Sequence, residues 1–227
     1  MPDRAELSQR LTATLSDANS YEEFLDRLRL FGQESLVLIG ARILSGTVSA
    51  AQAGSAFADV AEGIVHTVHG LVADQFASQY GRIGGQETAL LAMGKLGSRE
   101  MTASSDLDLI LIYDFDEDRP DSDGSRSLQG AQYFARFTQR LISAFTTRTN
   151  YGVLYDVDMR LRPSGRAGPV ASRLDAFASY QEVEAWTWEH MALTRARVIS
   201  ASPAFARKIE QVIRQVLTRP RDRSIIS

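Results

Sequence analysis

Two stripes of apolar residues at helical spacing dominate the first third of the chain. The first stripe repeats every four residues and consists of Leu7, Leu11 and Leu15. The second has spacings of three and four and consists of Phe57, Val60, Ile64, Val68 and Leu71. Ser20 followed by Glu23 is typical of a capping box and predicts a helix start between them. The run 36–39 could be a buried strand, but its flanks favour helix, so residues 1–82 are predicted to be helical.

The pattern changes after a group of glycines at residues 81–85. Two short apolar runs, 88–93 and 107–113, predict buried strands. A helical stripe follows them and consists of Phe134, Phe137, Leu141 and Phe145. Alternation over 153–161 predicts a further strand. Residues 83–171 are therefore predicted to form a small α/β core.

The last part of the chain is predicted to be helical again, over residues 172–227. Ser172 and Asp175 are candidate helix caps, and Pro203 marks a break. The end, residues 218–227, has no packed pattern. We expect it to be a loose end of a chain that continues further.

Composition and charge narrow the class of protein. The chain has 227 residues, a formal net charge of −3 and no cysteine. Disulfides, thiol catalysis and cysteine-based zinc sites are excluded, and no general basic field indicates nucleic acid. The sequence has no signal-peptide pattern and no apolar run of membrane length, so a cytoplasmic protein without membrane partners is expected. His66 and His69 have no third ligand nearby, which favours a structural pair over a metal site.

Two aspartates separated by one residue carry the main chemical signal. Alternate residues of a strand share a face, so Asp106 and Asp108 lie together while Leu107 and Leu109 face the core. Carboxylates that close disfavour each other's ionised form, and a divalent cation removes this penalty. Mg²⁺ prefers such hard oxygen ligands. The pair therefore predicts a magnesium site, with a solvated strand end as the alternative.

A glycine-rich segment lies about ten residues before these aspartates, directly after the first predicted strand. Gly94 and Gly97 would let backbone N–H groups approach phosphates without a side-chain clash. Ser98 adds a hydroxyl donor, and Lys95 adds a cation. The spacing matches neither a P-loop nor the dinucleotide fingerprint. Together with the aspartates, the segment predicts a phosphate-binding turn.

The strand-like segment after residue 153 supplies a third acid. Asp158 shares one face with Asp156, Arg160 and Arg162. Asp158 is predicted to complete a three-carboxylate site that holds two metal ions about 3.5–4 Å apart. Arg160 and Arg162 are expected to pair with phosphates or with the aspartates, and structural salt bridging is an equal alternative.

Taken together, these residues resemble the polymerase-beta-like nucleotidyltransferases, which combine a glycine-serine turn, a D-x-D pair and a distant third aspartate. The longer strings are similar to the bacterial glutamine synthetase adenylyltransferases. These strings are AMGKLGSRE at 92–100, SDLDL at 105–109, VDMRLRPSG at 157–165, and EAWTWEH at 184–190. Ser98 departs from the pattern, where glycine is more usual. The resemblance implies an α+β fold, with a small mixed-sheet core flanked by helical regions on both sides.

The resemblance also implies an activity: in-line transfer of AMP from ATP to a tyrosine of glutamine synthetase, with Mg²⁺. Asp106 and Asp108 would hold both metal ions, Asp158 would hold the one near the acceptor, and the turn with Ser98 would hold the β and γ phosphates. Proteins of this family carry one unit that adds AMP and one that removes it by phosphorolysis. The strings PSG at 163–165 and EAWTWEH favour the adding unit, and phosphorolytic removal is the alternative.

The partners implied are glutamine synthetase, ATP and a nitrogen-signalling regulatory protein. A further hypothesis is a protein-docking fragment that is inactive alone. The segment 180–197 gathers aromatic and basic residues, and we predict that it packs beside the metal site as one wall of a cleft. Within it, Trp186, Glu189 and His190 are expected to pack the segment onto the core. Arg195 or Arg197, whichever is exposed at the cleft, is expected to contact the acceptor.

Overall fold

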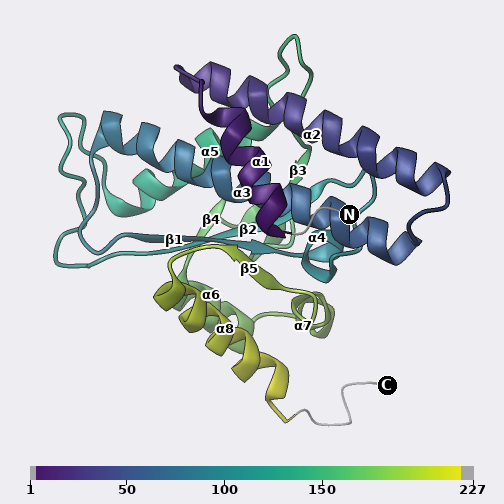
Figure 1. Ribbon diagram of the computed structural model, residues 1–227. Helices are drawn as coiled ribbons and strands as arrows, with labels where there is room; N and C mark the ends of the chain where they lie inside the picture. Colours follow the sequence, from purple (N-terminus) through teal and green to yellow (C-terminus); the bar gives the residue numbers. More distant parts are fainter. Residues whose placement is uncertain (1–3, 221–227) are drawn as a thin grey trace.

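A mixed five-stranded sheet separates two layers of helices in the computed structural model, which describes residues 4–220 (Figure 1). The strands are β1 (Glu87–Ala92), β2 (Leu107–Asp114), β3 (Val157–Asp158), β4 (Ala171–Arg173) and β5 (Arg197–Ser200). The helices α1, α2, α3 and α5 lie over one face, and α6, α7 and α8 lie over the other (Figure 1). The α+β class predicted from the sequence is confirmed.

The first helical layer follows the predicted stripes. Its helices are α1 (Arg4–Leu15), α2 (Tyr21–Leu44), α3 (Ala50–Tyr80) and, after β2, α5 (Gly130–Thr146). Ser20 caps α2, since its hydroxyl accepts from the Glu23 N–H at 3.1 Å. The Glu23 carboxylate accepts from Asn19 instead of Ser20, so the box is only half formed. The run 36–39 lies inside α2 and is helical, as its flanks indicated.

Strand β2 organises the sheet because both of its edges are paired. One edge runs antiparallel to β1, which in turn pairs antiparallel with β5. The other edge carries two short parallel strands in succession, β3 at the start of β2 and β4 near its end. In this register Asp108 is the direct partner of Asp158. Two acids that are fifty positions apart in the sequence are therefore direct neighbours on adjacent strands.

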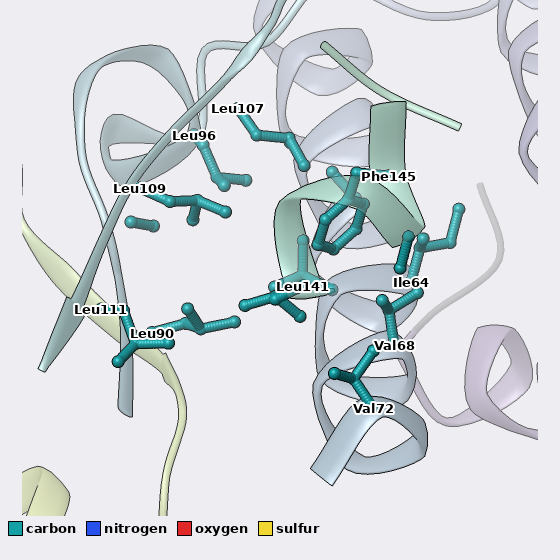
Figure 2. Close-up of a cluster of buried hydrophobic side chains, with 14 of the residues drawn as sticks. Ile64, Val68, Val72, Leu90, Leu96, Leu107, Leu109, Leu111, Leu141 and Phe145 are labelled. Atoms are coloured by element: carbon teal, nitrogen blue, oxygen red, sulfur yellow. The ribbon is translucent and has the colours of Figure 1, made fainter. Parts of the chain in front are cut away.

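Alternation along β2 divides the core into two clusters. Leu107, Leu109 and Leu111 point to the layer that contains α3 and α5 (Figure 2). Ile110 and Ile112 point to the opposite cluster, which packs beneath α6 and α8. By the same alternation Asp108 shares the face of Ile110. The acidic pair is therefore on the side of the sheet that the C-terminal helices cover.

Four further helices complete the described chain. They are α4 (Gly94–Ser98), α6 (Leu174–Val183), α7 (Thr187–Leu193) and α8 (Pro203–Thr218), with a single 3-10 turn at Gly165–Ala167. The expected loose end is described only as far as residue 220, and residues 221–227 lie outside the described part. Within residues 4–220, no helix has both the length and the apolar character needed to cross a bilayer.

Three expectations about local structure are wrong. The segment 153–161 is a strand only at β3, because the N–H groups of Leu154 and Tyr155 donate to the Phe145 carbonyl. The glycine segment forms the short helix α4 and is not an open turn. The region after residue 172 also contains strand β5, and Ser172 is buried in β4 and is not a helix cap.

The two histidines of α3 form a structural pair. The ring of His69 is buried between the hydroxyls of Ser200, at 2.7 Å, and Thr88, at 3.0 Å. His66 reaches the same Ser200 hydroxyl at 3.1 Å. Burial, followed by the neighbouring His66, lowers the pKa of His69 to about 4. His69 therefore stays neutral in the fold under conditions that would protonate it in the unfolded chain.

We expect His69 to make folding stability depend on pH below 6.5. Its folded-state pKa lies below the unfolded value of about 6.5, so the unfolded chain binds the proton first and stability falls as the pH drops towards 4. The loss is about 3 kcal/mol over this interval. Urea unfolding of wild type and His69→Gln between pH 7 and 4.5 measures it, with His66→Gln as the control. An unchanged slope in the His69 variant would contradict this assignment.

Candidate metal centre and nucleotide site

Three aspartates meet at one end of β2. Each of Asp106, Asp108 and Asp158 offers a carboxylate oxygen, and these oxygens lie within 4.8 Å of one another. Asp108 and Asp158 are paired across β2 and β3, while Asp106 precedes β2 by one residue. Asp106 is exposed, and the other two are partly buried. The structure thus brings together the three acids that the sequence singled out.

The charges of these acids are only partly balanced by the protein. Desolvation, followed by the charges of Asp106 and Asp158, raises the pKa of Asp108. Lys95 and Arg160 act in the opposite direction, so both cations lie close enough to influence Asp108. Three hard oxygen ligands with an excess of negative charge match the requirements of a divalent cation such as Mg²⁺. The donor set therefore fits the metal that the sequence implied.

Arg160 is the partner of the third acid. Its backbone N–H donates to Asp158 Oδ1 at 2.8 Å, its Nε donates to Oδ2 at 2.6 Å, and a second guanidinium nitrogen also contacts Oδ2. The hydrogen bond from the Arg160 side chain is the main reason that the pKa of Asp158 is lowered. The Arg160 side chain is 62% exposed, so a ligand can reach it from solvent. Asp158 is therefore held ionised beside an accessible cation.

Gly94 brings the backbone of α4 against Asp108. Its φ of 49° lies in the left-handed region, where L side chains are disfavoured. A Cβ atom at this position would collide with Oδ2 of Asp108 and lie 3.0 Å from its Cγ. The chain can therefore pass this close to the acidic cluster only with glycine. Lys95, the next residue, is exposed.

Gly97 and Ser98 have different surroundings. A Cβ on Gly97 would collide with the carbonyl oxygen of Arg195, so this glycine permits close packing against the chain that leads into β5. The Ser98 hydroxyl lies 2.8 Å from a carboxylate oxygen of Glu100 and 3.1 Å from the Gly94 carbonyl. In this structure both residues hold the segment in shape.

Arg162 is engaged by the backbone of its own loop. Its guanidinium donates to the carbonyls of Met159 at 2.8 Å, Pro169 at 2.9 Å and Gly168 at 3.2 Å. Arg162 therefore closes the loop between β3 and β4, whereas Arg160 faces the acids. The two arginines share a sequence pattern but not an environment.

The Glu189 carboxylate, and not the tryptophan side chains, connects the parts of segment 180–197. The Tyr180 hydroxyl donates to Glu189 at 2.9 Å, and the same carboxylate accepts from the Trp186 N–H at 2.8 Å. The Trp186 side chain is 72% exposed, so the expectation that it packs the segment onto the core is wrong. The protonated Nε2 of His190 donates to the carbonyl of Gln181 at 2.8 Å, because a carbonyl oxygen can only accept.

Arg197 and Arg195 also differ. Arg195 is exposed, whereas Arg197 is partly buried against the carbonyls of Leu96 and Gly97. The end of the segment thus lies against α4, at the same end of the sheet as α7 (Figure 1). The sequence did not reveal this role of Arg197, because the contact joins residues about a hundred positions apart.

The chain matches a known protein family over most of its length. The family described as glutamate-ammonia ligase adenylyltransferase matches residues 1–212. The chain is 84% identical over 227 residues to a protein of Rhodopseudomonas palustris (strain BisB5) and 78% identical over 227 residues to one of Bradyrhizobium diazoefficiens. It is 61% identical over 223 residues to a protein of Xanthobacter autotrophicus.

All three relatives bear the name bifunctional glutamine synthetase adenylyltransferase/adenylyl-removing enzyme. The matches cover 98% to 100% of this chain but only 22% or 23% of the relatives, so the chain spans less than a quarter of their length. The family match nevertheless extends over the N-terminal helices, the acidic centre and most of α8. The chain therefore belongs to the glutamate-ammonia ligase adenylyltransferase family.

Proposed function

We propose that this chain is the catalytic part of an adenylyltransferase that moves AMP from ATP to a tyrosine of glutamine synthetase. The observation that supports it most is the meeting of Asp106, Asp108 and Asp158 beside the glycine turn. The relatives' names supply glutamine synthetase as the acceptor and an adenylyl group as what is transferred, and ATP as the donor is part of the proposal. In this proposal residues 83–171 form the catalytic core, and the flanking regions 1–82 and 172–227 support it.

Asp106, Asp108 and Asp158 are proposed to hold Mg²⁺. When bound, Mg²⁺ would neutralise charge on the triphosphate and favour the ionised acceptor hydroxyl. The half-buried Asp108, whose ionisation is disfavoured by its surroundings, gains most from this neutralisation. Arg160 lowers the pKa of Asp158, and Asp158 is proposed to favour loss of the acceptor proton.

The residues around the acids are proposed to orient the triphosphate. Gly94 lets the backbone approach it, and Lys95 and Arg160 supply accessible positive charge. Gly97, Ser98 and Arg162 contribute by holding the two loops that carry these groups. The tyrosine oxygen then attacks the α-phosphorus in line, the new O–P bond forms, and the bond to pyrophosphate breaks.

A second candidate is phosphorolytic removal of AMP, in which an oxygen of inorganic phosphate attacks the phosphorus of the tyrosine-bound AMP, the bond to the tyrosine oxygen breaks, and ADP and the free tyrosine hydroxyl are formed. The relatives' names include an adenylyl-removing activity, and in this alternative the same acids and cations are proposed to serve the removal. The implied nitrogen-signalling partner, the absence of nucleic-acid partners and the cytoplasmic location stay predictions. The docking-fragment hypothesis predicts neither activity.

Incubation with labelled ATP distinguishes these candidates. With MgCl₂ and unmodified glutamine synthetase, we expect α-phosphate label to appear on the synthetase and pyrophosphate in solution. A parallel incubation contains AMP-modified synthetase and inorganic phosphate. Release of ADP there, without labelling in the first reaction, would identify the removing direction. No product in either reaction would support the docking fragment and reject both catalytic proposals.

A further inference from the structure

A network of charged side chains joins helix α3 to the short helix α4. Two acids of α3, Asp59 and Glu62, are its centre. Arg99, the residue that follows α4, donates to both oxygens of Asp59 at 2.8 and 2.9 Å and lies 3.5 Å from Glu62. Arg197, at the start of β5, pairs with Glu62. Side-chain exposure is 14% for Glu62 and 31% for Arg197, so the pair is largely shielded from solvent.

Arg197 also binds the backbone of α4 directly. Its Nε donates to the carbonyl of Gly97 at 2.7 Å, and its Nη2 donates to the carbonyl of Leu96 at 2.9 Å. The final carbonyls of a helix lack intrahelical donors, and a planar guanidinium can serve two of them at once. Glu62 in turn accepts from the same Nη2 of Arg197. The end of α4 is therefore held by a residue of β5 that is itself held by α3.

The other contacts of α4 leave it little freedom to move. Gly97 packs so closely on the Arg195 carbonyl that no Cβ would fit. On the α3 side, a Cβ on Gly54 would lie 3.3 Å from the Cα of Glu100. Because α4 is a single turn, displacement of its last carbonyls also moves Gly94, which touches Asp108. Arg197 therefore contacts the helix whose first residue, Gly94, lies against Asp108.

We propose that Arg197 is a positioning residue for ATP: it sets α4 against Asp108 and so orients the triphosphate, with Glu62 holding Arg197 in place. This inference rests on the proposed nucleotidyl transfer. It differs from the expectation that Arg197 meets the acceptor, because its guanidinium is occupied by Gly97, Leu96 and Glu62. Helix α3, whose Glu62 lies 44 positions before Asp106 in the sequence, thereby becomes part of the site's support.

The test uses Arg197→Met in the complete natural protein, with Arg4→Met as the matched control. Arg4 pairs with the same two acids, Asp59 at 2.7 Å and Glu62 at 3.0 Å. These hydrogen bonds connect Arg4 to α3 and not to α4. We expect Arg197→Met to raise the KM for ATP by roughly 10- to 100-fold, the range that displacement by about an ångström produces. The KM for glutamine synthetase should change less than about twofold. Arg197→Lys, which keeps the charge but loses the planar fork, should fall between the two.

A second readout needs no turnover. Mg²⁺-ATP should raise the melting temperature of wild type and Arg4→Met equally, and the increase should shrink in Arg197→Met. An ATP KM and a thermal shift equal to wild type in Arg197→Met would overturn the proposal. So would an equal rise in both KM values, or the same ATP defect in Arg4→Met. If wild type transfers no AMP, the proposed function fails, and the thermal shift still decides whether Arg197 positions the nucleotide.

Discussion

Replacing Asp106 with asparagine is expected to lower AMP transfer by on the order of 10³-fold while leaving the fold intact. The substitution removes one charged oxygen donor from a centre that depends on three. It also removes one of the charges that raise the pKa of Asp108. Because Asp106 is exposed, no core contact is lost. The melting temperature in the presence of a chelator should therefore be unchanged or slightly higher.

Asp156→Asn is the matched control. Asp156 is an exposed acid two residues before Asp158, and its recorded contact with β2 is a backbone one, to the Leu107 N–H. The chemical change is identical, but Asp156 is outside the group of three. Initial rates with saturating Mg²⁺ and ATP measure the difference. Equal losses in the two variants, or a tenth of the activity remaining in Asp106→Asn, would contradict the assignment of Asp106.

Replacing Gly94 with alanine is expected to abolish the stabilisation by Mg²⁺-ATP and to reduce transfer to a similar extent. The new Cβ cannot occupy its site beside the Asp108 carboxylate, so either α4 or the acid must move. A ligand at 100 times its Kd stabilises a fold by roughly 2.7 kcal/mol, which is the shift that should disappear. Thermal unfolding with and without Mg²⁺-ATP measures this loss.

Gly46→Ala separates the backbone cost from the local collision. Gly46 also has a positive φ, 67°, but a Cβ there would meet nothing within 4 Å. Both substitutions force alanine into the left-handed region, at about 1 to 2 kcal/mol. Only Gly94→Ala should lose the response to Mg²⁺-ATP. A full response in Gly94→Ala would exclude this turn from the nucleotide site.

The parts of the fold that the sequence predicted are those whose pattern repeats over many residues. Helix α3 has a long stripe, and β1 and β2 are apolar runs on both faces, so local physics and the final fold agree. Strands β3 and β4 have two and three residues, too few to show a period. They exist because β2 offers hydrogen bonds along its edge, and that partner is not visible in a local window.

In the candidate site, too, the sequence predicts what depends on local spacing and misses what depends on distant partners. The three acids were found because alternate spacing on a strand is a local property and because the strings resemble known enzymes. The contacts of Arg197 could not be predicted, because its partners Gly97 and Glu62 are about 100 and 135 positions away in the sequence. Arg160 and Arg162 have equivalent spacing, and only the folded loop separates a cation facing Asp158 from one bound to carbonyls.

Because β3 and β4 pair with the same edge of β2, the loop between them, residues 159–170, can change in length and sequence without disturbing the sheet. Both ends are fixed on the same strand, so the loop leaves and returns without crossing the sheet. The loop's tip includes the exposed residues Ser164 and Arg166. Doubling the length of such a closed segment costs only about 0.6 kcal/mol in chain entropy. Insertions at this tip can therefore remodel what approaches the acidic centre while Asp158 keeps its place.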